Sequence, residues 1–142
     1  MHKSTPIYVA GHLGLAGSAI CRELARQGFD NVIVRSRAEL DLTQWAPTRD
    51  FLVREKPAIV FIAAALVGGI AANEAYPADF LMQNLAVQMN VFRAAHEAQV
   101  DRIVFLGSSC IYPRDAAQPI VEDALLTGPL EATNRPYAIA KI

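Results

Sequence analysis

The sequence has little cysteine and no excess of either charge. Its two cysteines, Cys21 and Cys110, lie far apart in the chain, and no group of Cys and His residues has the spacing of a zinc site. We therefore expect neither a disulfide framework nor a bound metal. Two isolated cysteines are typical of a protein that stays in the reducing cytoplasm, which is where we expect this one.

Charged blocks and long apolar runs are also missing. The chain carries 13 Lys and Arg against 14 Asp and Glu, for a net charge of -1, so we expect no nucleic-acid partner and no membrane partner. The N-terminus has no signal-peptide pattern. The longest uncharged apolar stretch, residues 58–72, has 15 residues, fewer than the roughly 20 that a membrane span needs. We interpret it as a buried strand that runs into a loop of small residues.

What the chain does contain is an alternation of short apolar runs and segments with helical spacing. The apolar runs cover residues 7–10, 32–34, 58–62 and 103–106. They are apolar throughout rather than at every second position, which is typical of parallel strands buried on both faces. Strands that alternate with helices predict an α/β fold with a doubly wound parallel sheet, of the Rossmann type.

Three helices are predicted between and after these strands. The first ends at Gly28, the second begins after Asp41 or Thr43 and stops before Pro57, and the third runs from about Pro77 to Gln99. The expected buried faces are Ala16, Ala19, Ile20, Leu24 and Ala25 on the first helix, and Leu81, Leu85, Gln88, Phe92 and Ala95 on the third. The polar, proline-rich residues 113–136 predict a long surface loop.

The end of the chain suggests an incomplete domain. A helix is predicted to begin near Tyr137, only a few residues before Ile142, and a doubly wound sheet usually has more than four strands. We expect residues 1–142 to be an incomplete, truncated Rossmann domain, with a C-terminal substrate domain outside this chain. Because Lys141 lies one residue from the end, we expect the 142-residue chain alone to be inactive.

Three glycines follow the first strand in the motif VAGHLGLAG. Gly11, Gly14 and Gly17 form G-x-x-G-x-x-G, a variant of the dinucleotide fingerprint. The first glycine permits a sharp turn, the second lets a pyrophosphate approach the backbone, and the third lets helix and strand pack closely. The helix N-terminus then offers free N–H groups to the anion. The alternative is that the glycines serve only to pack a tight turn.

The end of the second strand indicates which dinucleotide is bound. An NAD site would place an acidic residue there, but this sequence has Arg35 and Arg37, whose guanidinium groups suit the 2′-phosphate of NADP(H). The alternative is that both arginines lie on a solvated face. Glu39 and Asp41 come too late in the sequence, and Asp41 is equally suited to cap a helix.

Tyr137 and Lys141 are four residues apart, so on a helix they project from one face. A nearby ammonium favours the phenolate, which would bring proton exchange by the tyrosine closer to neutral pH. Ser108 and Ser109 follow the fourth strand, at the sheet edge where open α/β sheets bind ligands. Either serine could hydrogen-bond a substrate oxygen beside the tyrosine.

Taken together, the motifs resemble the N-terminal part of the extended short-chain dehydrogenase/reductase family. The segments that carry the resemblance are AGHLGLAGSAI, VRSRAELDL, AAALVGGIAAN, YPADF, FLGSSCIYP and RPYAIAKI. The glycine loop and the Y-x-x-x-K pair mark the family as a whole. GSSCIYP and VGGI resemble the members that epimerise GDP-4-keto-6-deoxy-D-mannose at C3 and C5 and reduce it at C4 to give GDP-L-fucose.

This resemblance implies roles for individual residues. It implies a catalytic triad of Ser108, Tyr137 and Lys141, an epimerisation thiol at Cys110, a GDP-sugar substrate, NADP(H) as cofactor and a homodimer at full length. The implied cofactor contacts are Gly11, His12, Leu13, Gly14, Leu15, Ala16, Gly17, Arg35, Arg37, Leu106, Gly107, Ser108, Ser109 and Lys141.

The sequence departs from the family pattern at two positions. Leu13 and Leu66 stand where bacterial members often have Arg and Lys, which leaves the 2′-phosphate to Arg37 and Arg35. The family's second epimerisation residue, a histidine, belongs to a region beyond Ile142, and His12 is interpreted as a filler of the loop rather than a catalyst.

Other interpretations remain open from the sequence. The protein could be another sugar-nucleotide epimerase or dehydratase of this family, although those relatives need no thiol at Cys110, or it could be an inactive, truncated nucleotide-binding module. Cys110 itself could be a small packing residue. Asn84 could brace the active site or be an ordinary polar position, and the resemblance suggests that Asn73 shapes the sugar pocket.

Overall fold

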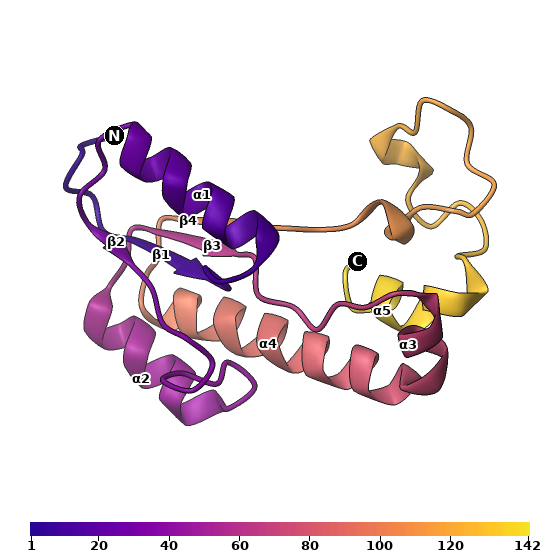
Figure 1. The fold of residues 1–142 in the computed structure, drawn as a ribbon, viewed down its shortest axis with the longest axis horizontal. Helices are drawn as coiled ribbons and strands as arrows, with labels where there is room; N and C mark the ends of the chain where they lie inside the picture. The colour runs from indigo at the N-terminus through magenta and orange to yellow at the C-terminus, as the bar shows by residue number, and fades with distance from the viewer. The chain divides into compact units, whose positions relative to one another are not determined.

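The computed structural model of the chain describes residues 1–142 and divides them into two compact units (Figure 1). The first unit comprises Met1–Ala65 and Ala86–Leu106. The second comprises Leu66–Leu85 and Gly107–Ile142.

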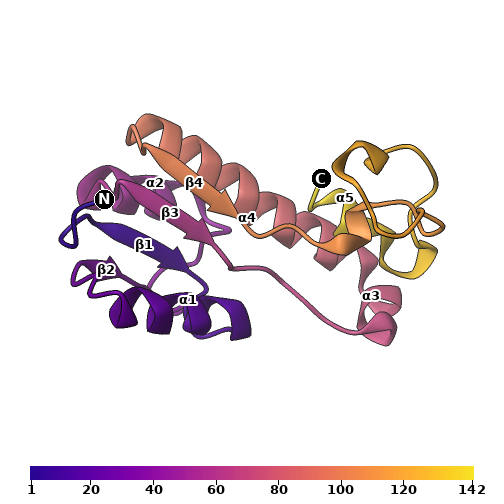
Figure 2. The ribbon, with the colours of Figure 1, turned by 90° about the horizontal axis from the view of Figure 1, so that it is seen from above.

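The first unit is built on a parallel sheet of four strands. These are β1 (Ile7–Ala10), β2 (Val32–Ile33), β3 (Ile59–Ile62) and β4 (Arg102–Phe105), in the order β2-β1-β3-β4 (Figure 2). The predicted fold class is confirmed, and the predicted strands differ from the observed ones by one residue at most at either end. The carboxyl ends of the three longer strands are level, because Ala10 pairs with Ile62 and Ile62 pairs with Phe105.

Helices cover both faces of this sheet, as buried parallel strands require. On one face, α1 (Leu15–Arg26) packs Ile20, Cys21 and Leu24 against the strand core. On the other face lie α2 (Trp45–Glu55) and the part of α4 (Pro77–Glu97) that belongs to this unit. Cys21 is thus a packing residue, and so are Trp45 and Phe51.

The buried faces of two helices differ from those predicted. On α1, Ala16, Ala19 and Ala25 are exposed, and the inward face is formed by Gly17, Ile20, Cys21 and Leu24. On α4 the fully buried positions are Phe80, Asn84, Val91, Ala94 and Ala95, whereas Phe92 is exposed. Small and polar residues occupy some inward positions, so a search for the most apolar stripe selected a face rotated by about one residue.

The start of α2 also differs from the prediction. The helix is capped by Gln44 without a side-chain hydrogen bond, so neither Asp41 nor Thr43 is its cap. Asp41 instead accepts hydrogen bonds from the backbone N–H and the hydroxyl of Thr43. The carboxylate therefore closes a turn just before the helix, a common alternative use of Asp.

The second unit contains α3 (Ile70–Ala75), the first turns of α4 and α5 (Arg135–Ile139). Residues 113–134 form most of the long loop predicted for 113–136, interrupted only by short 3₁₀ turns, and α5 begins at Arg135, so the loop ends two residues earlier than predicted. The 3₁₀ turns of this unit are η1 (Ser109–Ile111), η2 (Glu122–Ala124) and η3 (Ala132–Asn134). The sequence did not predict α3, because its two preceding glycines and run of alanines were interpreted as a loop. Pro136 lies at the start of α5, where proline is tolerated.

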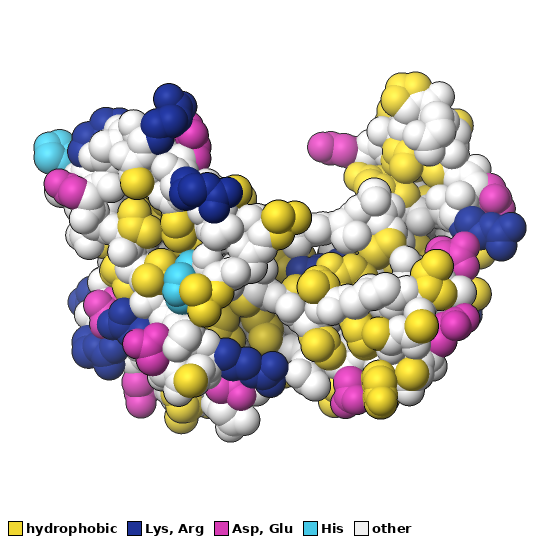
Figure 3. Space-filling view, viewed as in Figure 1, with side chains coloured by type: hydrophobic (Ala, Val, Ile, Leu, Met, Phe, Trp, Pro, Cys, Tyr) yellow, Lys and Arg dark blue, Asp and Glu magenta, His cyan; other side chains and the backbone are white.

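The surface has no concentration of one charge on the face that Figure 3 presents, where basic and acidic side chains are interspersed. No helix combines the length and the apolar character that a bilayer crossing requires. No three side chains of His, Cys, Asp or Glu are grouped in a way that could hold a metal ion.

Candidate active site

The glycine loop of the first unit connects the carboxyl end of β1 to α1. Gly11 has φ +82°, and a Cβ built on it would lie 2.6 Å from the backbone nitrogen of Ala64, so only glycine fits. Gly17 is buried, and a Cβ there would overlap the backbone of Gly11. Both glycines thus allow the helix to begin close against the strand, which is the arrangement that a phosphate-binding loop needs.

The remaining positions of the loop lie open around this turn. Leu13 and Leu15 are 77% and 94% exposed, and α1 begins at Gly14 with no side-chain cap and no acidic residue in its first turn. The N-terminus of this 12-residue helix therefore keeps its free N–H groups and its positive dipole for an anion. The Nδ1 atom of His12 is buried without a hydrogen-bond partner.

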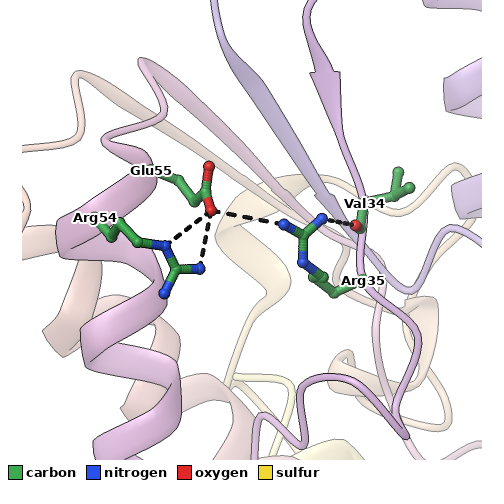
Figure 4. A network of polar contacts seen from close by, with 4 residues as sticks. All are labelled: Val34, Arg35, Arg54 and Glu55. Atoms are coloured by element: carbon green, nitrogen blue, oxygen red, sulfur yellow. Dashed lines mark hydrogen bonds and ion pairs between the residues drawn. The ribbon is translucent and has the colours of Figure 1, made fainter.

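The two arginines after β2 have different surroundings. Arg35 donates from Nη1 to the carbonyl of Val34 at 2.7 Å, and its Nη2 lies 3.6 Å from Glu55 (Figure 4). The same carboxylate accepts two hydrogen bonds from Arg54. The Arg35 guanidinium also lies over the ring of Phe51. Arg35 is therefore held by the protein itself.

Arg37, in contrast, is 71% exposed, and its guanidinium lies 4.0 Å from Asp41. The nearby carboxylate of Glu39 accepts hydrogen bonds from the backbone N–H and the hydroxyl of Ser36, both at 2.7 Å, and these bonds lower the pKa of Glu39. Because Glu39 is engaged in this turn, Arg37 is the side chain here with charge available to a phosphate.

In the second unit, Ser108 and Cys110 are joined within one turn. Ser108 caps η1, and its hydroxyl oxygen accepts a hydrogen bond from the backbone N–H of Cys110 at 3.4 Å. The Cys110 thiol donates to the same oxygen at 3.0 Å. Gly107, just before the pair, has no heavy atom within 4 Å of a Cβ built on it, so the backbone there is open to approach.

Tyr137 lies on α5, and Lys141 follows the end of that helix. The Lys141 side chain is buried, with 6% of the residue exposed, and its Nζ lies 5.9 Å from the centroid of the Tyr137 ring. Burial lowers the pKa of Lys141, and the neighbouring Cys110 partly offsets this. The Lys141 ammonium and the Tyr137 ring are thus close to each other, as their spacing predicts, although α5 ends before the lysine.

The expected effect of the ammonium on the phenol is not found in this arrangement. Burial raises the pKa of Tyr137 above its usual value, and the nearby Cys110 raises it further. The main cause is burial, because the surrounding protein penalises a charged phenolate. The phenol therefore stays protonated at neutral pH.

Two buried asparagines hold the segment that follows β3. The Asn84 side chain accepts from the N–H of Leu66 at 2.8 Å and donates to the carbonyls of Leu66 and Phe80. Asn73 donates to the carbonyls of Gly68 and Gly69 at 3.0 and 3.1 Å. Of the two interpretations of Asn84, the structure therefore supports the bracing one.

One residue of this region was missed entirely. Phe80 is 4% exposed and packs edge-on against Tyr137, with ring centroids 6.4 Å apart. The spacing of four residues between Phe80 and Asn84 was a signal in the sequence, but the predicted stripe on this helix was one residue out of phase.

The predicted residues are thus divided between the two units. The first unit holds the glycine loop, Arg35, Arg37 and Leu106. The second unit holds the remaining predicted site residues, which are Gly107, Ser108, Ser109, Cys110, Tyr137 and Lys141. The first set has the features of a dinucleotide-phosphate site, and the second combines a thiol, a hydroxyl, a phenol and an amine.

Comparison with known proteins agrees with this arrangement. The profile of the NAD dependent epimerase/dehydratase family matches residues 7–142. GDP-L-fucose synthase 1 of Arabidopsis thaliana is 58% identical over 140 residues, which cover 99% of this chain and 43% of that protein. GDP-L-fucose synthase of Sinorhizobium fredii is 57% identical over 136 residues, which cover 96% of this chain and 43% of that protein.

A solved structure is similar over nearly the whole chain. MlghC, a GDP-mannoheptose C4 reductase from Campylobacter jejuni with NADP bound, superimposes with a TM-score of 0.95 at 40% identity, over 99% of this chain and 45% of that one. The resemblance seen in the sequence motifs is confirmed by these matches. The chain spans about 43% of the length of the curated relatives named above.

Proposed function

The chain belongs to the NAD dependent epimerase/dehydratase family, and on that premise we propose that the full-length protein is a sugar-nucleotide epimerase and reductase. It uses NADPH to convert GDP-4-keto-6-deoxy-D-mannose to GDP-L-fucose, with epimerisation at C3 and C5 and reduction at C4. The observation that carries this proposal is the hydrogen-bonded pair of Ser108 and Cys110 in the same compact unit as Tyr137 and Lys141. Relatives named GDP-L-fucose synthase support the choice of sugar.

The residues of the first unit fit a dinucleotide. The cradle between Gly11, Gly17 and the open start of α1 suits a pyrophosphate, and the exposed Arg37 suits a 2′-phosphate. The structurally similar C4 reductase is named with NADP bound. We assign further cofactor contacts to the segment from Leu106 to Ser109 and to Lys141. When bound, NADPH supplies the hydride for the reduction.

Cys110 serves as the base in epimerisation. The C4 ketone acidifies the protons at C3 and C5, and a thiolate can remove such a proton, breaking a C–H bond and forming S–H while the electron pair moves to the C4 oxygen. A thiol ionises close enough to neutral pH to cycle its proton, whereas a serine hydroxyl does not. The resemblance assigns the opposing proton donor to a histidine beyond Ile142. Ser108 stabilises the enolate oxygen by hydrogen bonding.

Tyr137 serves as the acid in reduction. A C4 ketone that accepts hydride becomes an alkoxide, and the phenol gives this oxygen its proton while Ser108 donates a hydrogen bond to it. Burial raises the pKa of Tyr137, so the phenol is in its protonated, donating form at neutral pH. The same C4 oxygen is thus contacted in both reactions, which allows one pocket to serve epimerisation and reduction.

Three features of the whole protein are part of the proposal. Residues 1–142 form the NADP-binding part of a longer enzyme whose substrate domain lies outside this chain, as the greater length of the relatives suggests. The enzyme works in the cytoplasm, in keeping with its two free cysteines. It is a homodimer, as its family resemblance implies, and light scattering of the full-length protein would test this.

The direct test is turnover. Full-length protein incubated with GDP-4-keto-6-deoxy-D-mannose should oxidise NADPH, which is measured as a loss of absorbance by the reduced nicotinamide. The product should be GDP-L-fucose, identified by chromatography. Substrate-dependent oxidation with a 4-reduced but unepimerised product would indicate a C4 reductase instead. The absence of any oxidation would favour an inactive nucleotide-binding module.

A further inference from the structure

We propose that Phe80 is a positioning residue for Tyr137, and that Gly68 and two buried asparagines hold Phe80 in place. The proposal rests on the function proposed above, in which Tyr137 gives a proton to the substrate. It concerns residues of the second unit only, and none of the sequence motifs assigns Phe80 a role.

The contact between the two rings is direct. Phe80 lies in the first turn of α4, is 4% exposed, and meets Tyr137 with an interplanar angle of 79° and a centroid distance of 6.4 Å. This is the edge-to-face geometry that aromatic pairs prefer. Figures 1 and 2 both show α5 beside the first turns of α4.

Tyr137 depends on such contacts because its own helix is short. The helix α5 has five residues, too few to be stable by its own hydrogen bonds, so packing must hold its side chains. Lys141 lies over the Tyr137 ring, with Nζ 5.9 Å from the centroid, and Phe80 packs against the ring with its edge. The aromatic contact limits the tilt of the phenol and therefore the direction of its hydroxyl.

Gly68 makes room for the Phe80 ring. A Cβ at Gly68 would lie 2.9 Å from Cζ of Phe80 and 3.1 Å from Cβ of Ala72. Real Cβ atoms do not approach that closely, so any side chain at this position would displace the end of the ring. The glycine is therefore required by packing against the residue that contacts the tyrosine.

The backbone behind the ring is fixed by hydrogen bonds. Asn84, one helical turn after Phe80, binds both backbone groups of Leu66 and the carbonyl of Phe80. Asn73 binds the carbonyls of Gly68 and Gly69. Both asparagines are 4% exposed, so these bonds are shielded from competing water. The segment from Leu66 to Gly69 thereby forms a rigid support for Phe80.

The consequence is kinetic rather than structural. Proton transfer depends steeply on the position of the donor, so a phenol that loses its lateral support should react more slowly even when substrate and cofactor bind normally. Loss of the Phe80 ring should therefore lower kcat while leaving the KM for NADPH unchanged.

The experiment compares Phe80→Leu with Phe92→Leu in the full-length protein. Phe92 is a control for the loss of an aromatic contact on the same helix, because its ring makes an edge contact with Phe105 at 5.8 Å, although it is 38% exposed whereas Phe80 is 4% exposed. We expect Phe80→Leu to lower kcat for reduction by about tenfold or more, and Phe92→Leu to leave it within about twofold. The KM for NADPH should be the same in both. Equal values of kcat in the two variants would overturn the proposal.

A second comparison keeps the test independent of folding defects in one variant. Gly68→Ala should displace Phe80 and lower kcat, but should have a smaller effect in a Phe80→Leu background, where the ring end is gone and only the contact with Cβ of Ala72 remains. If Gly68→Ala lowered kcat by the same factor in the wild-type and Phe80→Leu backgrounds, the proposal would be contradicted. If the unmodified protein does not reduce the 4-keto sugar, the proposed function itself is rejected. If the unmodified protein reduces the sugar and the variants have the same kcat, only the positioning role of Phe80 is rejected.

Discussion

The thiol of Cys110 donates a hydrogen bond to the hydroxyl of Ser108 across 3.0 Å. The backbone N–H of Cys110 binds the same oxygen, so the hydroxyl and the thiol are held two residues apart in one 3₁₀ turn. In the proposed mechanism the serine stabilises the C4 oxygen and the cysteine works at the adjacent carbons. A local turn thus sets the spacing between these two groups.

The first prediction concerns the choice of cofactor. Arg37→Ala should weaken NADPH binding by roughly tenfold to a hundredfold, since it removes a charge-assisted contact to phosphate, and should leave NADH binding unchanged. Arg26→Ala is the control, because Arg26 is an exposed arginine that Glu23 binds and is not among the predicted cofactor contacts. Titration of the full-length variants with both cofactors measures this. Equal effects of Arg37→Ala on NADPH and NADH would refute the assignment.

The second prediction concerns the glycine loop. Gly11→Ala places a methyl 2.6 Å from the backbone of Ala64 at a φ of +82°, and should lower the free energy of unfolding of the 142-residue chain by about 1–3 kcal/mol. Gly69→Ala is the control, because a Cβ there meets nothing within 4 Å. Urea denaturation measures both. A Gly11→Ala variant as stable as Gly69→Ala would show that the loop relaxes easily.

The third prediction concerns stability at alkaline pH. Burial raises the pKa of Tyr8 well above its usual value of about 10, and Arg35 only partly opposes this. Its contribution to stability is therefore complete below about pH 10, the pKa in the unfolded chain, and is lost as the pH rises further. The melting temperature should fall above that pH, and less so in Tyr8→Phe. The exposed Tyr76 provides the control, and an equal benefit from Tyr76→Phe would contradict this explanation.

The fourth prediction concerns the acid in reduction. Tyr137→Phe keeps the ring that packs against Phe80 but removes the proton that the alkoxide needs. In the full-length protein, kcat for reduction should fall by about a hundredfold or more, with NADPH affinity unchanged. Tyr112→Phe, the same change just after the 3₁₀ turn η1, should have little effect on kcat. Unchanged turnover in Tyr137→Phe would rule out the phenol as the acid.

The sequence predicted the sheet and the glycine loop well because their signals are local. Four apolar runs without alternation have few interpretations other than parallel strands, and the glycines fall directly between a strand and a helix. The residues of α4 that face the interior could not be predicted in the same way. Its buried face includes Asn84, a polar residue whose partner Leu66, 18 residues earlier, is brought to it only by folding.

The surroundings of the predicted site residues could not be read from the sequence. Arg35 and Arg37 look alike in the sequence, yet Glu55, which is twenty residues later, binds one and not the other. Likewise, the spacing of Tyr137 and Lys141 predicted a lowered phenol pKa, but burial raises it. Desolvation depends on everything packed around a group, so the Y-x-x-x-K motif alone could not have indicated it.

The measurement that tests the central claim most directly is proton NMR of the reaction in D₂O, with full-length protein, GDP-4-keto-6-deoxy-D-mannose and NADPH. The proposed mechanism predicts GDP-L-fucose that carries deuterium at C3 and C5, and it predicts that Cys110→Ser abolishes this exchange while NADPH still binds. Cys21→Ser, the same change at the other cysteine, which packs against the sheet, should leave the exchange intact. Full deuterium incorporation in Cys110→Ser would contradict the assignment of the thiol as base, and a product without deuterium from the unmodified protein would contradict epimerisation altogether.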